Sequence, residues 1–254
     1  MVVEYKTEGR VAIITLNRPE ARNAVNGEVA QGMEKALDSY ESDPELWAAI
    51  LTANGKAFCA GADLKAIAAG KGGELRTEKG GFGGIVTRQR IKPLIAAVTG
   101  SALAGGTEIA LSCDIIISSD ETNFGLPEVK RSLVAAAGGL YRLPRAIGMA
   151  SALEAILTGD PLSSQRAYEL GMVNKVCPTD QVVPEAMKMA HRICANAPLA
   201  VQASLKVAKR ALAEDDETLL KAGQAEFAGL AQTEDYKEGP KAFIEKRAPV
   251  WKGK

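Results

Sequence analysis

The stretch TGSALAGGTEIALSC, residues 99–113, follows an apolar, strand-like run at residues 93–98 and leads into a helical pattern. Before its glycines every residue except Leu103 is small, and Gly105 and Gly106 lack a Cβ, so the backbone can lie against a ligand there. The free N–H groups of a helix start favour anionic oxygen, and Glu108 falls in the first turn beside them. We interpret this stretch as part of a site.

Composition excludes several classes of partner. The chain has 254 residues, of which 46% are hydrophobic and 24% charged, and its 31 basic and 31 acidic residues balance. This balance predicts no nucleic-acid partner and no attraction to an anionic membrane. The N-terminus has no apolar core behind a basic start, which predicts no secretion signal. The longest apolar region, residues 93–119, is interrupted by Glu108 and Asp114, so we expect a buried core and no membrane span.

Cysteine and histidine usage narrows the chemistry. Four cysteines show neither close pairing nor metal-ligand spacing, which predicts free thiols in a reducing cytoplasm. The single histidine, His191, excludes a His-rich metal site. A Ser-His-Asp or Cys-His mechanism is possible only if His191 itself serves. Acid–base chemistry therefore falls to carboxylates, lysines or tyrosines.

Apolar patterning predicts an α/β fold with some parallel strand pairing. Strands are expected at residues 11–16, 47–52, 93–98, 114–118, 123–129 and 171–177. Helices are expected at residues 27–40, 150–157, 163–170, 181–196, 199–212 and 217–230. Residues 70–84, rich in glycine and charge, are predicted to form a mobile surface loop near a site. We place a soft boundary near residue 195, which separates a core at 1–195 from a helical segment at 196–254.

Two corners of small residues, 60–63 and 104–107, have a common design. Backbone N–H groups converging there can form an oxyanion hole, in which each donor contributes a factor of about 10² to 10³ in rate. Glu108 and Glu128 lie in apolar surroundings, where burial raises a carboxyl pKa and a close pair can divide acid and base roles. The alternatives are packing corners with surface or capping glutamates, or a glycosidase pair. A glycosidase is disfavoured because aromatic residues make up 5% of the chain.

The chain resembles the crotonase (enoyl-CoA hydratase/isomerase) superfamily over nearly its whole length. The matching segments are residues 17–24, 56–64, 93–98, 104–110, 113–116, 124–128 and 237–247. The resemblance implies a spiral of ββα turns followed by a C-terminal helical segment that takes part in assembly of a homotrimer, or of a hexamer made of two trimers. It implies an acyl-CoA substrate, with CoA arriving as part of that substrate. It implies no metal or redox cofactor.

The resemblance also assigns site residues. The thioester oxygen would be held by the backbone N–H groups of Ala62 and Gly105. The positions that match CoA contacts of the family are Ala21, Arg22, Ala60, Asp63, Leu64, Phe243 and Lys246, the last two sometimes reaching a neighbouring subunit's CoA.

The glutamate pair selects among the reactions of the superfamily. Isomerases of the family use one carboxylate, whereas hydratases use two, which favours hydration of the C2–C3 double bond of a 2-enoyl-CoA. Glu128 would donate a proton to C2 and Glu108 would help activate the water. The alternatives are an isomerase, a carnitinyl-CoA dehydratase-like lyase, as the ending at residues 249–253 suggests, or a non-catalytic acyl-CoA binder. Ala135 and Ala136 stand where family hydratases carry proline and glycine, a departure that bears on water placement.

Overall fold

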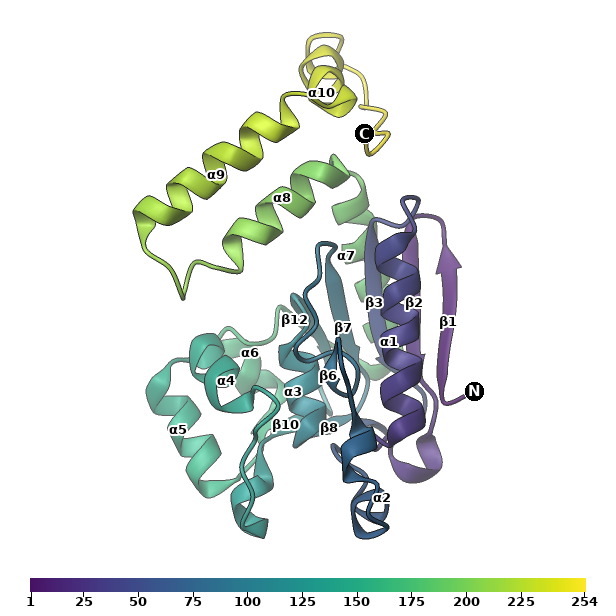
Figure 1. Ribbon diagram of the computed structural model, residues 1–254, viewed down its shortest axis with the longest axis vertical. Coiled ribbons are helices and arrows are strands. Elements are labelled where there is room, and N and C mark those ends of the chain that lie inside the picture. Colours follow the sequence, from purple (N-terminus) through teal and green to yellow (C-terminus); the bar gives the residue numbers. More distant parts are fainter.

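The computed structural model describes residues 1–254, and its strands form two sheets and a hairpin (Figure 1). The first sheet has the order β1-β2-β3-β7-β9-β12, with β1 antiparallel to β2 and every other pair parallel. Its strands are β1 (Val3–Glu8), β2 (Val11–Leu16), β3 (Ala48–Ala53), β7 (Leu94–Val98), β9 (Ile115–Ser119) and β12 (Lys175–Cys177). The second sheet consists of β11 (Leu162–Ser163), β10 (Asn123–Gly125), β8 (Ser101–Leu103) and β4 (Ala57–Cys59), in that order. The α/β class and the parallel pairing are confirmed.

Burial on both faces explains the continuous apolar runs of the central strands. Every residue of β2, β3 and β7 is buried. Alternate side chains contribute to two different cores, because successive residues of a strand point to opposite faces. Leu94, Ala96 and Val98 belong to the larger core, whereas Ile95 and Ala97 pack beneath helix α7 (Val182–Cys194).

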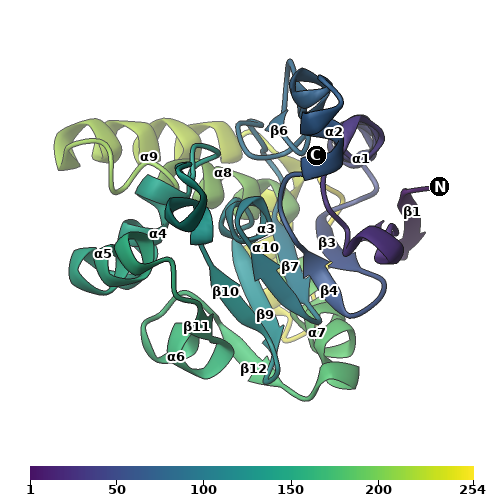
Figure 2. The same ribbon diagram turned by 90° about the horizontal axis from the view of Figure 1, so that it is seen from below.

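A repeated ββα turn generates the two sheets together. In each turn one strand enters the first sheet, the next enters the second sheet, and a helix follows. The three turns are β3-β4 with α2 (Leu64–Ala68), β7-β8 with α3 (Gly105–Leu111), and β9-β10 before α4 (Gly139–Ile147). Successive turns stack, so β8 is the parallel neighbour of both β4 and β10, and the three strands end at one side of the second sheet. Figure 2 shows β4 and β10 from below. The spiral expected from the resemblance is therefore the observed architecture.

Helices cover both faces of the first sheet. Helix α1 (Gly27–Ser42) is capped by Asn26, whose side chain accepts a hydrogen bond from the amide of Val29. Its buried stripe of Val29, Met33, Leu37 and Tyr40 packs toward β1 and β2. The helices are α1 (Gly27–Ser42), α2 (Leu64–Ala68), α3 (Gly105–Leu111), α4 (Gly139–Ile147), α5 (Met149–Thr158), α6 (Ser164–Glu169), α7 (Val182–Cys194), α8 (Pro198–Ala208), α9 (Asp216–Leu230) and α10 (Glu234–Ile244). The 3₁₀ turns are η1 (Pro19–Ala21), η2 (Gly72–Leu75), η3 (Pro127–Arg131) and η4 (Thr179–Gln181).

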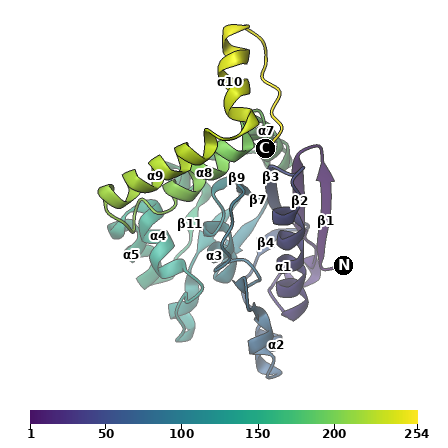
Figure 3. The ribbon, with the colours of Figure 1, turned by 45° about the horizontal axis from the view of Figure 1, so that its top comes forward.

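The last three helices extend away from the sheets. Helix α9 lies against α8, and α10 projects beyond them at the end of the molecule opposite α2 (Figures 1 and 3). Large apolar side chains remain exposed on these helices, among them Leu220, Phe227, Phe243 and Ile244. None of the helices is both long and apolar enough to cross a membrane.

Several features differ from the sequence-based expectations, among them helices α4 and α10 and strands β4 and β8, which were not expected. Strand β1 was not expected, because its mostly exposed edge position leaves only Val3 buried. The run at residues 93–98 does not lead directly into the glycine turn, since the chain first crosses to the second sheet and forms β8. Residues 70–84 are not a structureless loop: they contain η2 and the hairpin of β5 (Arg76–Thr77) and β6 (Gly81–Phe82), which is fixed by burial of Leu75 and Phe82.

Candidate active site

Three neighbouring strand ends form the candidate site. The chain leaves β4 through residues 60–63, leaves β8 through residues 104–108 and leaves β10 through residues 126–128. Because these strands are parallel and adjacent, the two small-residue corners and both predicted glutamates meet at one edge of the second sheet. The corners are in contact: a Cβ added to Gly61 would lie 2.9 Å from the nitrogen of Gly105.

The first corner leaves the amide of Ala62 without a partner. Ala62 forms an isolated parallel bridge with Val25, in which the amide of Val25 donates to the oxygen of Gly61 and the amide of Asp63 donates to the oxygen of Val25. These bonds use the groups on either side of Ala62. In a strand its own N–H therefore points away from Val25, and it donates to no acceptor in the chain.

The second corner exposes the amide of Gly105 in the same way. Ala104 has φ +52° and ψ −126°, a conformation that strains a non-glycine residue and turns the chain sharply from β8 into α3. Gly105 is the first helical residue, so its N–H has no intrahelical acceptor, and no other acceptor is found. A Cβ at Gly105 would lie 2.4 Å from Cε1 of Phe82, which explains the requirement for glycine.

Glu108 is a buried carboxyl held by a backbone amide. It is 3% exposed, and its Oε1 accepts a hydrogen bond of 2.9 Å from the amide of Gly139. Burial raises the pKa of Glu108, and the charge of Glu128 raises it further, whereas the Gly139 hydrogen bond opposes the rise. The result is a carboxyl that is poised to accept a proton yet stabilised when ionised.

Glu128 differs from Glu108 in its hydrogen bonding. Its Oε2 is buried and has no hydrogen-bond partner. Burial raises the pKa of this carboxyl too, while its own backbone amide and the charge of Arg131 act in the opposite direction. A buried carboxyl oxygen without a donor favours the protonated acid, so the two glutamates are suited to different roles.

A cavity of about 620 Å³ lies over both amides and both glutamates. Apolar side chains line much of it, including Leu75, Phe82, Leu133 and Val134. A larger cavity, of about 860 Å³, lies elsewhere, between α4, α8 and the segment before β7. It contains neither glutamate, so the smaller cavity is the candidate active site.

The structure divides the predicted CoA contacts within the core. Arg22, Ala60 and Leu64 line the candidate cavity, but Ala21 and Asp63 do not. Asp63 is engaged elsewhere: it caps α2 by accepting from the amides of Lys65 and Ala66, and it pairs with Arg18 at 2.6 Å. The Asp63 side chain is therefore engaged by Arg18 and by the start of α2, and it does not line the cavity in which the CoA contact was predicted.

The two C-terminal positions lie far from the cavity of the same chain. Phe243 belongs to α10, is 86% exposed and stands at the opposite end of the molecule from α2 (Figure 1). Lys246 follows α10 with φ +54°. Within one chain these residues are not brought together with Ala62 or Gly105.

The segment that departs from the family pattern forms one wall of the cavity. Ala136 and Ala137 line it, whereas Ala135 is 3% exposed and packs inward. The amide of Ala136 donates to the oxygen of Val134 at 2.8 Å, so it is occupied by a tight turn.

One positioning residue escaped sequence analysis. Arg142, on α4, donates from Nη2 to the oxygen of Val86 at 2.5 Å and from Nη1 to the oxygen of Ala137 at 3.2 Å. It therefore ties the start of α4, and Ala137 just before it, to the segment that carries Val86. No local signal in the sequence distinguishes Arg142 from an exposed helical arginine, because the Val86 carbonyl lies on a segment distant in sequence.

The chain is similar to known proteins over nearly its whole length. The model of the enoyl-CoA hydratase/isomerase family matches residues 6–254. The chain is 37% identical to 2,3-dehydroadipyl-CoA hydratase of Escherichia coli over 257 residues, covering 96% of each chain, and 39% identical to short-chain-enoyl-CoA hydratase of Clostridium acetobutylicum, covering 96% of this chain and 95% of the relative. A crystal structure of an enoyl-CoA hydratase from Mycobacterium tuberculosis is similar over 100% of this chain and 99% of that chain, with a TM-score of 0.96 and 44% identity.

Proposed function

The chain belongs to the enoyl-CoA hydratase/isomerase family, and on this premise we propose that it is an enoyl-CoA hydratase, a hydro-lyase. It adds water reversibly across the C2–C3 double bond of a 2-enoyl-CoA thioester and yields a 3-hydroxyacyl-CoA. The observation that carries this proposal is the convergence of Glu108 and Glu128 on one cavity that also contains two unpartnered amides.

The amides of Ala62 and Gly105 receive the thioester oxygen. When water attacks C3, negative charge moves from the double bond to this oxygen and an enolate forms. Two fixed donors stabilise that charge more strongly than they stabilise the neutral carbonyl, which lowers the barrier. The strain at Ala104 and the bridge at Ala62 hold both donors in place before substrate binds.

The two glutamates then move protons. Glu108, whose carboxylate is stabilised by the Gly139 amide, removes a proton from the water as its oxygen bonds to C3. Glu128, whose buried oxygen favours the acid, gives its proton to C2 and collapses the enolate. Water thus supplies both the hydroxyl group and, after proton exchange between the carboxyls, the replacement proton.

Loss of absorbance of the conjugated thioester of crotonyl-CoA tests the proposal. We expect Glu108→Gln and Glu128→Gln each to lower kcat by about 10² to 10⁴, because each removes one proton transfer. Glu154→Gln, an exposed change on α5, is the matched control and leaves turnover unchanged. Wild-type turnover in both active-site variants would refute the mechanism, and proton exchange at C2 without oxygen uptake from labelled water would identify an isomerase.

Contacts with CoA extend the proposal along the cavity. Arg22, Ala60 and Leu64 line the side from which the pantetheine and adenine portions would approach. Ala21 and Asp63 support this side from η1 and from the start of α2, Asp63 by holding the α2 cap. Phe243 and Lys246 would contact a neighbouring subunit's CoA, because in their own chain they lie at the opposite end of the molecule.

We further propose assembly as a homotrimer or as two trimers. The support is the set of exposed apolar side chains on the C-terminal helices, among them Leu220 at 63%, Phe227 at 62% and Phe243 at 86% exposure.

Four free thiols, two of them buried, support a reducing, cytoplasmic location. Fatty acid β-oxidation is the pathway class that uses this reaction on plain acyl chains.

A further inference from the structure

Beyond the catalytic groups, the candidate cavity contains an uneven distribution of charge. Three arginines line it, Arg22, Arg76 and Arg131, against the two glutamates of the reaction. None of the three arginines forms an ion pair or a side-chain hydrogen bond within the chain, whereas Arg18 pairs with Asp63 and Lys130 pairs with Asp160. A plain hydrocarbon chain offers no partner to a cation in the cavity wall.

Arg131 is the arginine that shares a 3₁₀ turn with Glu128. Glu128 and Arg131 are the second and fifth residues of the 3₁₀ turn η3, and in such a turn side chains three residues apart are eclipsed. Arg131 therefore stands on the face that carries Glu128, one turn or roughly 6 Å farther along. It does not pair with Glu128, whose Oε2 remains without a partner.

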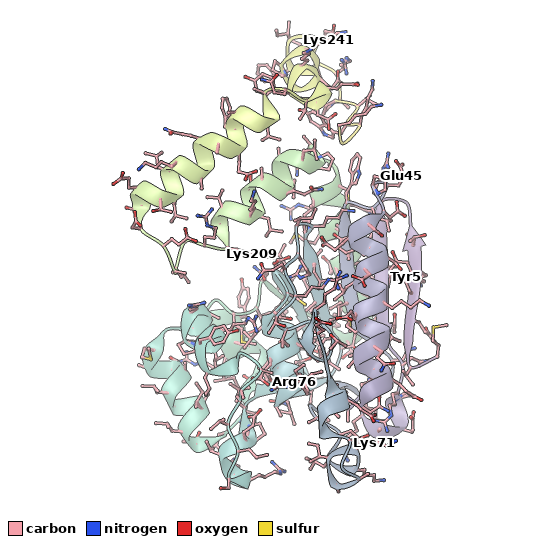
Figure 4. All side chains as sticks on the ribbon, viewed as in Figure 1. Tyr5, Glu45, Lys71, Arg76, Lys209 and Lys241 are labelled. Carbon is pink, nitrogen blue, oxygen red and sulfur yellow. The ribbon has the colours of Figure 1, made fainter.

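The neighbouring lysine shows that this position is special. Lys130 points to the other side of η3 and pairs with Asp160 at 2.6 Å, outside the cavity. Adjacent cations of the same turn thus have different surroundings: one is neutralised by the protein, and the other is left free in the cavity wall. Arg76, labelled in Figure 4, adds a second free guanidinium from β5, on the separate segment that encloses the cavity with Leu75 and Phe82.

We propose that Arg131, aided by Arg76, recognises a carboxylate on the acyl group, so that the substrate class is a short dicarboxylic 2-enoyl-CoA. The inference rests on the proposed function, because it takes Glu128 to mark carbon C2. A guanidinium binds a carboxylate with two parallel hydrogen bonds, a geometry that a lysine or an amide does not offer. The lining of the same cavity also includes the apolar residues Leu133 and Val134, which suit the methylene groups of an acyl chain.

Binding of unreactive thioesters tests this inference without catalysis. Adipoyl-CoA and hexanoyl-CoA have the same number of acyl carbons and differ in the terminal carboxylate. By calorimetry we expect the protein to bind adipoyl-CoA at least about tenfold more tightly, the size of one charge-assisted contact. We expect Arg131→Gln to remove this preference, and Lys130→Gln to leave it intact. The preference should also weaken as salt is raised, since Arg131 is exposed.

The outcomes separate the possible roles of Arg131. If Arg131→Gln weakens both ligands equally, the arginine contacts the CoA phosphates and the inference is wrong. If wild-type protein binds both ligands equally, the inference is likewise wrong. If the preference is present but neither crotonyl-CoA nor hex-2-enedioyl-CoA is hydrated, the carboxylate site stands and the proposed hydratase function fails. Where both are turned over, the ratio of the two kcat/KM values within each variant repeats the test, because a general loss of activity cancels in that ratio.

Discussion

Gly105→Ala is the sharpest perturbation of the proposed oxyanion hole. The added Cβ would lie 2.4 Å from Cε1 and 2.6 Å from Cζ of Phe82, distances at which an atom must move, and 3.3 Å from Cα of Gly61. Phe82 is 8% exposed, so its ring has little room, and the strained Ala104 corner is the other element able to shift. A shift of that corner moves the Gly105 N–H away from the thioester oxygen.

Loss of one oxyanion donor lowers kcat by about 10² to 10³, or roughly 3–4 kcal/mol of barrier. The crowding itself costs about 1–3 kcal/mol of folding stability. The assay is the initial rate of crotonyl-CoA hydration, with thermal unfolding measured on the same samples. We expect the activity loss to exceed what the small population of unfolded protein explains.

Two further variants make this prediction refutable. Leucine has neither Cε1 nor Cζ, so Phe82→Leu combined with Gly105→Ala should recover about tenfold of the lost rate by returning space to the corner. Gly223→Ala, on α9 where an added Cβ meets nothing within 4 Å, should keep full activity and gain about 0.5–1 kcal/mol of stability. If Gly105→Ala retains turnover within roughly threefold of wild type, its amide is not an oxyanion donor.

Three other predictions concern the glutamates, the α2 cap and Arg142. Burial raises the pKa of Glu108 and of Glu128. Between the ordinary and the raised pKa values, the folded state therefore binds more protons than the unfolded state. As a result, the contribution of the two glutamates to the free energy of unfolding falls as pH rises through this window. The double variant Glu108→Gln, Glu128→Gln should therefore have a higher melting temperature than wild type above this pH window, and the difference should disappear near pH 4. If both proteins show the same pH dependence of the melting temperature, the assigned burial is contradicted. Asp63→Ala should cost about 1–3 kcal/mol in urea unfolding, because it removes the cap of α2 and leaves Arg18 without its partner. Arg142→Met should lower kcat and move the acidic limb of the kcat/KM profile to higher pH, because the guanidinium lowers the pKa of the base Glu108 and holds Ala137. A loss of stability with an unmoved profile would reduce its role to packing.

Much of the fold could be predicted from local patterns. The runs at residues 11–16 and 93–98 are strands because buried parallel strands require apolar side chains on both faces, and helix α1 has the spacing and the cap that an amphipathic helix needs. Strand β1 and the hairpin β5-β6 escaped prediction because they are short or exposed, and their stability comes from partners distant in sequence.

The chemical inventory of this protein can be read from its amino-acid sequence: two corners of small residues, two glutamates in apolar surroundings, and one histidine. The tertiary structure decided how these groups are used. Stacking of the ββα turns brings the ends of β4, β8 and β10 together, and the bridge with Val25 frees the amide of Ala62. The tertiary structure also places Asp63 at the α2 cap and leaves Arg131 without an ion-pair partner beside Glu128. Composition and periodicity report what a residue can do, whereas hydrogen-bond partners and burial depend on contacts between segments far apart in the chain, which no local pattern encodes.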